Sequence, residues 1–229
     1  MNVMPYTIRA RWGDVSKIVD LVTDTLYPTP IGSWLVPDDD QRRVVLSAVA
    51  RIWTEHALLV GEAHMLPDRT AAAIWFHRYR PIPEPVEYRT RLAAACGDHV
   101  DRLSLLDRVL RRQRPADPHN HLAFLAVPPG PRRAERSAAV LTASQLRIDP
   151  LGLPAYVEAF TPTQRELYGR HGYHGGDSFT LPDGTAVQPM WRGPRGRAAP
   201  LPINGVAEWS IRRPPGRPRN GRVGAWSPR

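Results

Sequence analysis

Residues His121–Tyr173 read HLAFLAVPPGPRRAERSAAVLTASQLRIDPLGLPAYVEAFTPTQRELYGRHGY, and this stretch decides the fold. It predicts a buried strand over 121–127, a tight basic loop, a helix over roughly 134–147, a strand over 155–159 and a helix over 162–171. Unpaired N–H groups and the helix dipole converge where a loop leads from a strand into a helix. The loop before the first helix is therefore a candidate site for a phosphate-bearing ligand.

The sequence before and after this stretch predicts further strands and helices. The expected elements are a strand over 6–11, a helix capped by Asp14, a proline-broken loop over 28–37, a helix from Asp38–Asp40 onward, a hairpin of 58–63 with 71–77, a helical region over 86–113 interrupted near Gly97, and a hairpin of 178–181 with 187–191. The alternation of strands and helices predicts an α/β fold with a mixed sheet.

The composition excludes several classes of protein. A chain of 229 residues can bury one substantial core, and no run approaches the roughly 18 apolar residues of a membrane span. The N-terminus MNVMPYTIRA does not have the pattern of a secretion signal. Cys96 is the single cysteine, which excludes an internal disulfide and a cysteine-based metal cluster. We therefore expect a soluble, cytoplasmic protein.

The positive charge is concentrated at the C-terminus. From Arg192 onward there are nine arginines and one acid, Glu208, so eight of the nine net positive charges lie there. Seven prolines and six glycines in 193–229 leave little to bury. We expect a folded domain over 1–192 and a basic tail over 193–229 that is disordered or draped over the surface. Clustered charge of this kind attracts an RNA or an acidic carrier protein.

The strand LAFLAV, the basic loop and the following helix resemble motif A of the GNAT (Gcn5-related N-acetyltransferase) superfamily. In that family the loop reads Gln/Arg-x-x-Gly-x-Gly/Ala, and its backbone N–H groups bind the pyrophosphate of CoA. Here the motif falls on residues 132–137: Arg132 matches, while Glu135 and Ser137 occupy the two small positions. Glycine allows backbone to approach phosphate closely, and the Glu135 carboxylate is repulsive there. The resemblance implies acetyl-CoA or another acyl-CoA as co-substrate, bound by Phe124, Leu125, Val127, Arg132, Arg133, Ala134, Arg136, Ser137 and Gln164.

The stretch GLPAYVEAFTPTQRELYGRHGY, residues 152–173, resembles motif B of the same family. Tyr168 falls on the tyrosine that acts as general acid in many members, and Gln164 stands where an asparagine is frequent. A phenol keeps its proton near neutral pH and can donate it to a leaving thiolate. Together with the ending LPDGTAVQPMWR, which resembles the last hairpin of some bacterial members, the likeness covers most of 6–192. It implies a mixed, mostly antiparallel central sheet flanked by helices on both faces.

A general base is also expected, because an acceptor ammonium must lose a proton before it attacks. The candidates are His119, His121 and Glu158 and, more remotely, Glu62. His119 and His121 are two residues apart on a strand, which places both rings on one face. With neither a cysteine nor a carboxylate pattern near these histidines, we expect no metal site.

The leading interpretation is an N-acyltransferase that forms an amide from an acyl-CoA, by default acetyl-CoA, and a primary amine of a small molecule. A second takes the acyl or aminoacyl group from a tRNA or a carrier protein, because the loop lacks the glycines and Arg132, Arg133, Arg136 and the tail suit phosphate-rich donors. A third is a non-catalytic binding module of the same fold. For each we expect a monomer or a homodimer.

Overall fold

The computed structural model describes residues 6–194, which contain eight strands and seven α-helices. The strands are β1 (Ile8–Arg9), β2 (Gly61–Met65), β3 (Ala72–Arg78), β4 (His119–Ala126), β5 (Ala155–Ala159), β6 (His174–Gly175), β7 (Phe179–Thr180) and β8 (Ala186–Arg192). The helices are α1 (Val15–Leu26), α2 (Pro30–Leu35), α3 (Asp39–Val60), α4 (Tyr88–Cys96), α5 (Val100–Gln113), α6 (Arg133–Ile148) and α7 (Pro162–Arg170). These residues belong to the first of two units of the chain, Met1–Ala199, and the predicted tail lies outside them from residue 195 on.

The strands form one mixed sheet in the order β1-β2-β3-β4-β5-β8-β6, with β7 paired to β8. Every pairing is antiparallel except that of β4 with β5, which is parallel. The predicted mixed, mostly antiparallel sheet is therefore confirmed. The parallel pair requires a long crossover, and α6 with its flanking loops supplies it.

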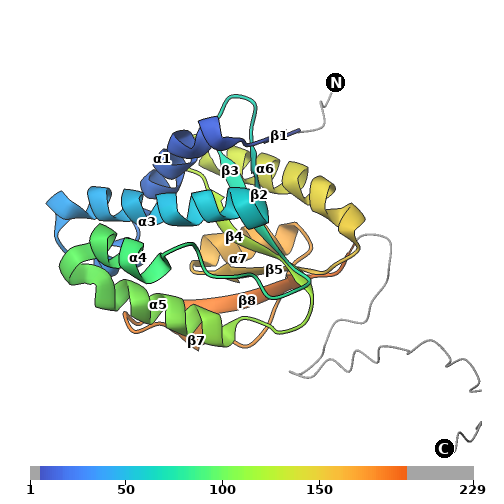
Figure 1. Ribbon diagram of the computed structural model, residues 1–229. Coiled ribbons are helices and arrows are strands. Elements are labelled where there is room, and N and C mark those ends of the chain that lie inside the picture. Colours follow the sequence, from blue (N-terminus) through green and yellow to red (C-terminus); the bar gives the residue numbers. More distant parts are fainter. Residues whose placement is uncertain (1–5, 195–229) are drawn as a thin grey trace, which may run out of the picture. The chain divides into compact units, whose positions relative to one another are not determined.

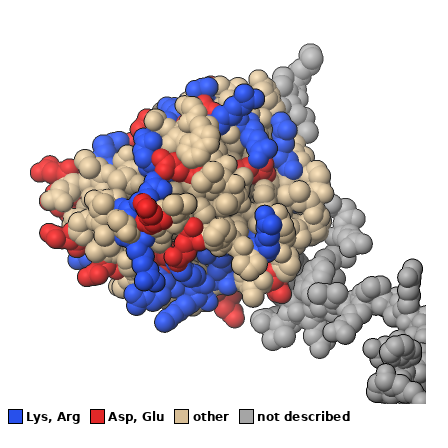
Figure 2. Space-filling model, viewed as in Figure 1, with Lys and Arg blue, Asp and Glu red and all other residues tan. Residues whose placement is uncertain are grey.

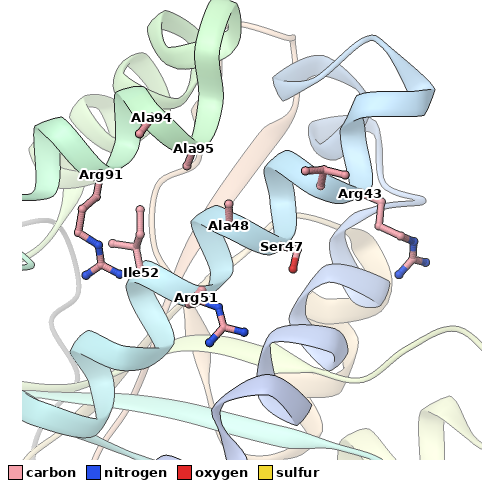
Figure 3. Close-up of a pocket in the computed structure, with 9 residues that line it drawn as sticks. Arg43, Ser47, Ala48, Arg51, Ile52, Arg91, Ala94 and Ala95 are labelled. Atoms are coloured by element: carbon pink, nitrogen blue, oxygen red, sulfur yellow. The ribbon is translucent and has the colours of Figure 1, made fainter.

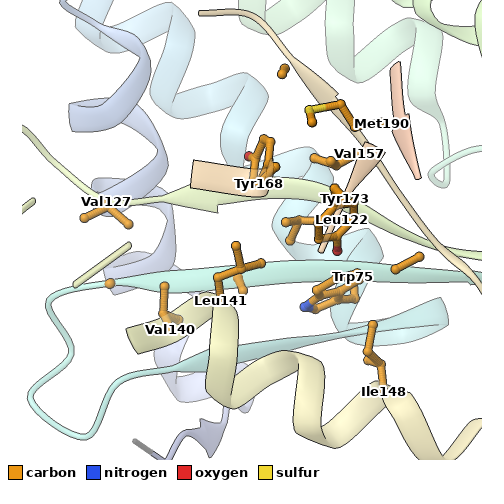
Figure 4. Packing of buried hydrophobic residues seen from close by; sticks show 14 of the residues in the cluster. Trp75, Leu122, Val127, Val140, Leu141, Ile148, Val157, Tyr168, Tyr173 and Met190 are labelled. Atoms are coloured by element: carbon orange, nitrogen blue, oxygen red, sulfur yellow. The ribbon is translucent and has the colours of Figure 1, made fainter. Parts of the chain in front are cut away.

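Helices cover both faces of the sheet, as predicted (Figure 1). Alternate residues of a strand point to opposite faces. On β3, Ile74 and Phe76 pack with α1 and α3, whereas Trp75 packs with α6 and α7. The cluster around Trp75 also contains Leu122, Val157 and Tyr168, whose side chains converge in Figure 4. In residues 6–194 no helix has both the length and the apolar character needed to cross a membrane.

Two sequence predictions near the N-terminus were wrong. The segment 28–37, predicted as a loop, contains α2, because Thr29 caps it by accepting from the N–H of Gly32 (3.1 Å) and Pro30 suits a first helical position. The apolar residues 58–60, predicted as strand, are the last residues of α3. Short apolar runs have no period that separates helix from strand, and here the helix continues. The two-residue strand β6 was not predicted.

Gly61 joins α3 directly to β2 with no loop between them. Its N–H donates to the carbonyl of Ala57 and ends the helix, and its Cα stands opposite that of Phe76 in the sheet. A Cβ at this position would lie 2.3 Å from the carbonyl oxygen of Trp75 and 3.2 Å from that of Ala57. Only glycine lets the two strands approach this closely at the helix end.

We expect Gly61→Ala to lower the free energy of unfolding by about 2 kcal/mol, because backbone of β3 has to move away from the new methyl group. Urea denaturation followed by circular dichroism measures the change. Gly13→Ala is the matched control, since a Cβ at Gly13 meets nothing within 4 Å. Equal stability of Gly61→Ala and the control would contradict this account of the junction.

Candidate active site

An opening in the sheet separates the ends of β4 and β5. The two strands pair only through residues 120–122 with 155–157, while β4 continues along β3 as far as Ala126. Leu122 lies opposite Trp75 and Phe124 opposite Ile74, so Ala123 is an extra, bulged residue of β4. Within residues 6–194, one edge of β4 therefore has no strand partner beyond Leu122, and the sheet does not satisfy the backbone N–H and C=O groups on that edge.

The loop after β4 leads to the N-terminus of α6, as the sequence predicted. Its three prolines have no N–H, and the N–H of Arg133 donates to the carbonyl of Gly130 (3.1 Å). Within residues 6–194 the N–H groups of Ala134 and Glu135 have no hydrogen-bond partner. These two donors and the dipole of a 16-residue helix face the same point. The arrangement is suited to an anion.

The side chain of Glu135 turns back onto Arg132. The Arg132 Nε and Nη2 atoms donate to the two oxygens of Glu135 at 3.0 and 2.8 Å, and both side chains are about two-thirds exposed. The Arg132 guanidinium holds the pKa of the Glu135 carboxyl below its usual value. One of the three arginine charges here is thereby neutralised within the first helical turn, whereas Arg133 is exposed and Arg136 is half-buried, with no partner for its Nε among the described residues.

Two of the predicted cofactor-binding residues have structural roles. Ser137 is 8% exposed and lies within α6 instead of at the loop surface. The side-chain oxygen of Gln164 accepts from the backbone N–H of Phe160 (2.8 Å). The backbone N–H of Gln164 donates to Thr161 Oγ1 (3.1 Å). Both contacts stabilise the start of α7. Phe124 and Leu125 are half-buried on β4, and Val127 is buried directly after it.

His121 and Glu158 form a buried pair at the opening. The Nε2 of His121 lies 2.8 Å from Glu158 Oε2, and the two side chains are 5% and 7% exposed. Leu122 and Val157 are the last residues of β4 and β5 that pair with each other. His121 directly precedes Leu122 on β4, and Glu158 directly follows Val157 on β5. The Nδ1 of His121 accepts a hydrogen bond from Arg78 Nε at 3.3 Å. The fold thus brings two of the predicted base candidates together.

The surroundings of the pair keep His121 neutral and Glu158 negatively charged. Burial lowers the pKa of His121 below its usual value and prevails over the neighbouring Glu158. Burial alone would raise the pKa of Glu158, but His121 and Arg114 outweigh it, and the pKa lies below its usual range. Both directions describe a neutral imidazole donating to a carboxylate.

The other two base candidates lie elsewhere. His119 shares the face of His121, with ring centroids 6.2 Å apart, but it lies further from the opening, and its Nδ1–H donates to the carbonyl of Asp117 (2.6 Å). Burial lowers the pKa of His119 to about 4. Glu62 lies on the opposite face, 3.3 Å from His64 and 3.2 Å from His77. The two histidines hold its pKa far below the usual range.

Tyr168 lies on the α7 side of the opening, in the same cluster as the last paired residues Leu122 and Val157 (Figure 4). It is 2% exposed, and its ring centroid is 5.7 Å from that of Tyr173. Burial raises the pKa of its hydroxyl, and the charge of Glu158 adds to the effect. The hydroxyl therefore keeps its proton at neutral pH.

Sequence reasoning missed three residues around the pair, namely Arg78, Arg114 and Tyr156. Arg78 ends β3, Tyr156 lies opposite His121 on β5, and Arg114 follows α5. Arg114 helps to lower the pKa of Glu158, and burial raises that of Tyr156. No sequence spacing links these positions to His121. Pairing between strands distant in the sequence brings Arg78 and Tyr156 beside it.

A separate open groove of about 600 Å³ lies between α3 and α4 (Figure 3). Its arginines are already paired, Arg43 with Asp24 at 2.7 Å and Arg91 with Glu55. None of the predicted site residues lines it. Among residues 6–194 no group of three histidines, cysteines or carboxylates has the geometry to hold a metal ion.

No model of a known protein family matches this sequence. Solved structures do match it. A Corynebacterium glutamicum protein described as histone acetyltransferase HPA2 and related acetyltransferase is 22% identical, with a TM-score of 0.66 over 86% of this chain and 100% of its own. The C-terminal condensation domain of Ebony, in complex with beta-alanyl-dopamine, is 13% identical, with a TM-score of 0.54 over 82% and 97%. A mosquito protein described as arylalkylamine N-acetyltransferase like 5b is 16% identical, with a TM-score of 0.52 over 82% of this chain and 98% of its own. The chain has the fold of the GNAT superfamily, as the two motifs predicted.

We expect the protein to lose about 2 kcal/mol of unfolding free energy through His119 alone between pH 7 and pH 5. The unfolded histidine takes up a proton below its ordinary pKa near ~6.5, whereas the folded one stays neutral until about pH 4. The unfolded state therefore binds more protons in this window, and stability falls as the pH falls. In His119→Phe this contribution is absent, which urea denaturation at the two pH values measures.

His174→Phe is the control, because His174 is exposed on β6 and its replacement should leave the acid-side loss unchanged. The assignment to His119 is wrong when His119→Phe and wild type lose the same free energy over these two pH values.

Proposed function

We propose that the chain is an N-acyltransferase that moves an acyl group from an acyl-CoA to a primary amine of a small molecule. The observation that carries the proposal is the opening between β4 and β5. The unpaired edge of β4, the buried His121–Glu158 pair and Tyr168 all lie next to the last paired residues of the two strands, Leu122 and Val157. These are the three kinds of group that aminolysis of a thioester requires.

The reaction proceeds by direct attack of the amine on the thioester carbonyl. The acceptor ammonium first loses a proton to the His121–Glu158 pair, which frees the nitrogen lone pair. The C–N bond then forms and the C–S bond breaks, while N–H groups of the Phe124–Val127 segment polarise the carbonyl oxygen. Tyr168 gives its proton to the leaving sulfur and regains one from the attacking nitrogen, directly or through solvent, so the products are an amide, a thiol and the proton first taken from the ammonium.

The N-terminus of α6 supports acyl-CoA as the donor. The N–H groups of Ala134 and Glu135 have no other partner within the described residues, and Arg132, Arg133 and Arg136 surround them. A pyrophosphate fits these donors and charges. The Glu135 carboxylate weakens the fit because it occupies Arg132, and in the bound state a phosphate replaces it as the partner of Arg132.

A second candidate keeps the chemistry and changes the donor to an aminoacyl-tRNA or an acyl carrier protein. The missing loop glycines favour it, and the Ebony condensation domain has the same fold. The face shown in Figure 2 carries both basic and acidic side chains, with arginines gathered over α5, and is therefore not uniformly basic. The basic tail, the main argument for such a donor, lies outside the described residues.

A third candidate, a non-catalytic binding module, differs in its reaction to substitution. The buried pair and the buried Tyr168 would then only stabilise the fold. This candidate leaves the unpaired edge of β4 without a role, and we rank it last.

Titration with acetyl-CoA and with bulk tRNA, followed by isothermal calorimetry, distinguishes the donors. We expect binding of acetyl-CoA, and an about two- to fivefold lower Kd in Glu135→Gln, because loss of one exposed carboxylate frees Arg132. Glu166→Gln, which breaks a similar exposed pair with Arg170 on α7, is the control. Salt-sensitive tRNA binding without acetyl-CoA binding would overturn the proposed donor.

We expect Tyr168→Phe to reduce kcat by about a hundredfold while KM changes little, because the proton donor acts only as the thiolate leaves. Initial rates with acetyl-CoA and a panel of primary amines measure it. Tyr173→Phe is the matched control, since it removes a second buried hydroxyl from the same cluster. A Tyr168→Phe enzyme as active as this control leaves Tyr168 without a catalytic role.

A further inference from the structure

Both ring nitrogens of His121 are engaged, and their partners differ in kind. Arg78 Nε lies 3.3 Å from Nδ1, and Glu158 Oε2 lies 2.8 Å from Nε2. A guanidinium can only donate a hydrogen bond, so Nδ1 has to accept. A neutral imidazole has one N–H, which therefore sits on Nε2 and points at the carboxylate. In the other tautomer, the Nδ1–H of His121 and the Nε–H of Arg78 would point at each other, and neither would have an acceptor.

We infer that Arg78 is a positioning residue that fixes His121 in the Nε2–H tautomer, so that Glu158, and not His121, takes the proton of the acceptor amine. The inference rests on the proposed function for the identity of the proton donor. The tautomer itself does not depend on that function. It follows from three side chains on three adjacent strands, β3, β4 and β5.

The free oxygen in this cluster belongs to Glu158. Its Oε1 is buried and makes no hydrogen bond within the described residues, and the side chain is 7% exposed. Glu158 stands one residue beyond the last pair of β4 with β5, which places it at the opening. Because His121 has no lone pair left to accept a proton, a proton arriving from an ammonium has Glu158 Oε1 as its acceptor.

The proton balance closes without a further reactant. The ammonium N–H bond breaks, Glu158 becomes a neutral acid, and the freed amine forms the C–N bond as the C–S bond breaks. Tyr168 protonates the sulfur. The nitrogen loses its second proton to the Tyr168 phenolate directly or through solvent, and Glu158 releases its proton to solvent, so an ammonium and a thioester give an amide, a thiol and one free proton.

The surrounding charges keep Glu158 ionised before the proton arrives. The groups that act on the pair are Arg78 from β3, Arg114 after α5, His119 from β4 and Tyr156 from β5. Arg114 Nε is buried and unpaired, and the Arg78 guanidinium lies over the Phe76 ring at 5.6 Å. His119 stays neutral, so the two arginines are the positive charges in this set.

Nitrogen NMR of 15N-histidine-labelled protein tests the tautomer without any substrate. The His121 signals are assigned by their loss in His121→Gln, and the other seven histidines serve as internal references. We expect a protonated Nε2 and an unprotonated Nδ1 in wild type. Arg78→Met, which removes the donor, should shift both nitrogens toward the average of two tautomers. Arg78→Gln, which retains an N–H donor without the charge, should keep the wild-type pattern.

Arg80→Met is the matched control, because Arg80 is exposed just beyond β3 and its guanidinium lies over the Tyr79 ring. Its spectrum and its activity should equal those of wild type. A wild-type spectrum with the proton on Nδ1 overturns the inference at once. So does an Arg78→Met spectrum in which the His121 nitrogens do not move. Should Arg78→Met not fold, the wild-type and Arg78→Gln spectra still decide.

Kinetics test the consequence for the base. We expect Arg78→Met to lower kcat about ten- to a hundredfold and to add an ionisation near the ordinary histidine pKa to its pH profile, because a released His121 can then accept the proton. Arg78→Gln should recover most of kcat. A pH profile of Arg78→Met identical to that of wild type overturns the positioning role. Absence of turnover in wild type, with the expected spectra, overturns the proposed function and leaves the tautomer established.

Discussion

The parallel pairing of β4 with β5 extends over only three residues of each strand, and the position of every candidate functional group depends on where it stops. Past Leu122 the chain of β4 stays with β3, so its other edge is left without a partner. Unpaired backbone inside a fold is costly unless a ligand or water satisfies it. A bulge at Ala123 and the basic loop leading to α6 follow directly on this edge.

The same sheet carries two buried ionisable clusters on opposite faces, and they differ in the partners of their carboxylates. Glu62 lies between His64 and His77, both close to one of its oxygens. Glu158 has one oxygen bound to His121 and the other free. A buried charge is stable only when it is paired and hydrogen-bonded. The first cluster is therefore suited to holding strands together, and the second retains capacity for a proton.

Much of the fold was accessible from hydrophobic patterning. The strand over 155–159 was predicted residue for residue, and the helix after the basic loop within one residue at each end. The failures came from local chemistry that the pattern does not show, such as the Thr29 cap that forms α2 and the glycine that ends α3 at Val60. In the site, the two motifs indicated Tyr168 and the α6 loop. They did not indicate that the Gln164 side chain binds the Phe160 N–H before α7, or that Glu135 binds Arg132.

Local composition and spacing were sufficient to predict most strands and helices, the superfamily resemblance and a short set of candidate acids and bases. The tertiary structure decided which candidates meet. His121 and Glu158 are 37 residues apart and Arg78 and His121 are 43 apart, yet each pair is within hydrogen-bonding distance. Strand register sets those contacts, and register depends on how β3, β4 and β5 pack between two helical layers. Only the packed sheet could separate the pair at the opening from the histidine and glutamate candidates that lie away from it.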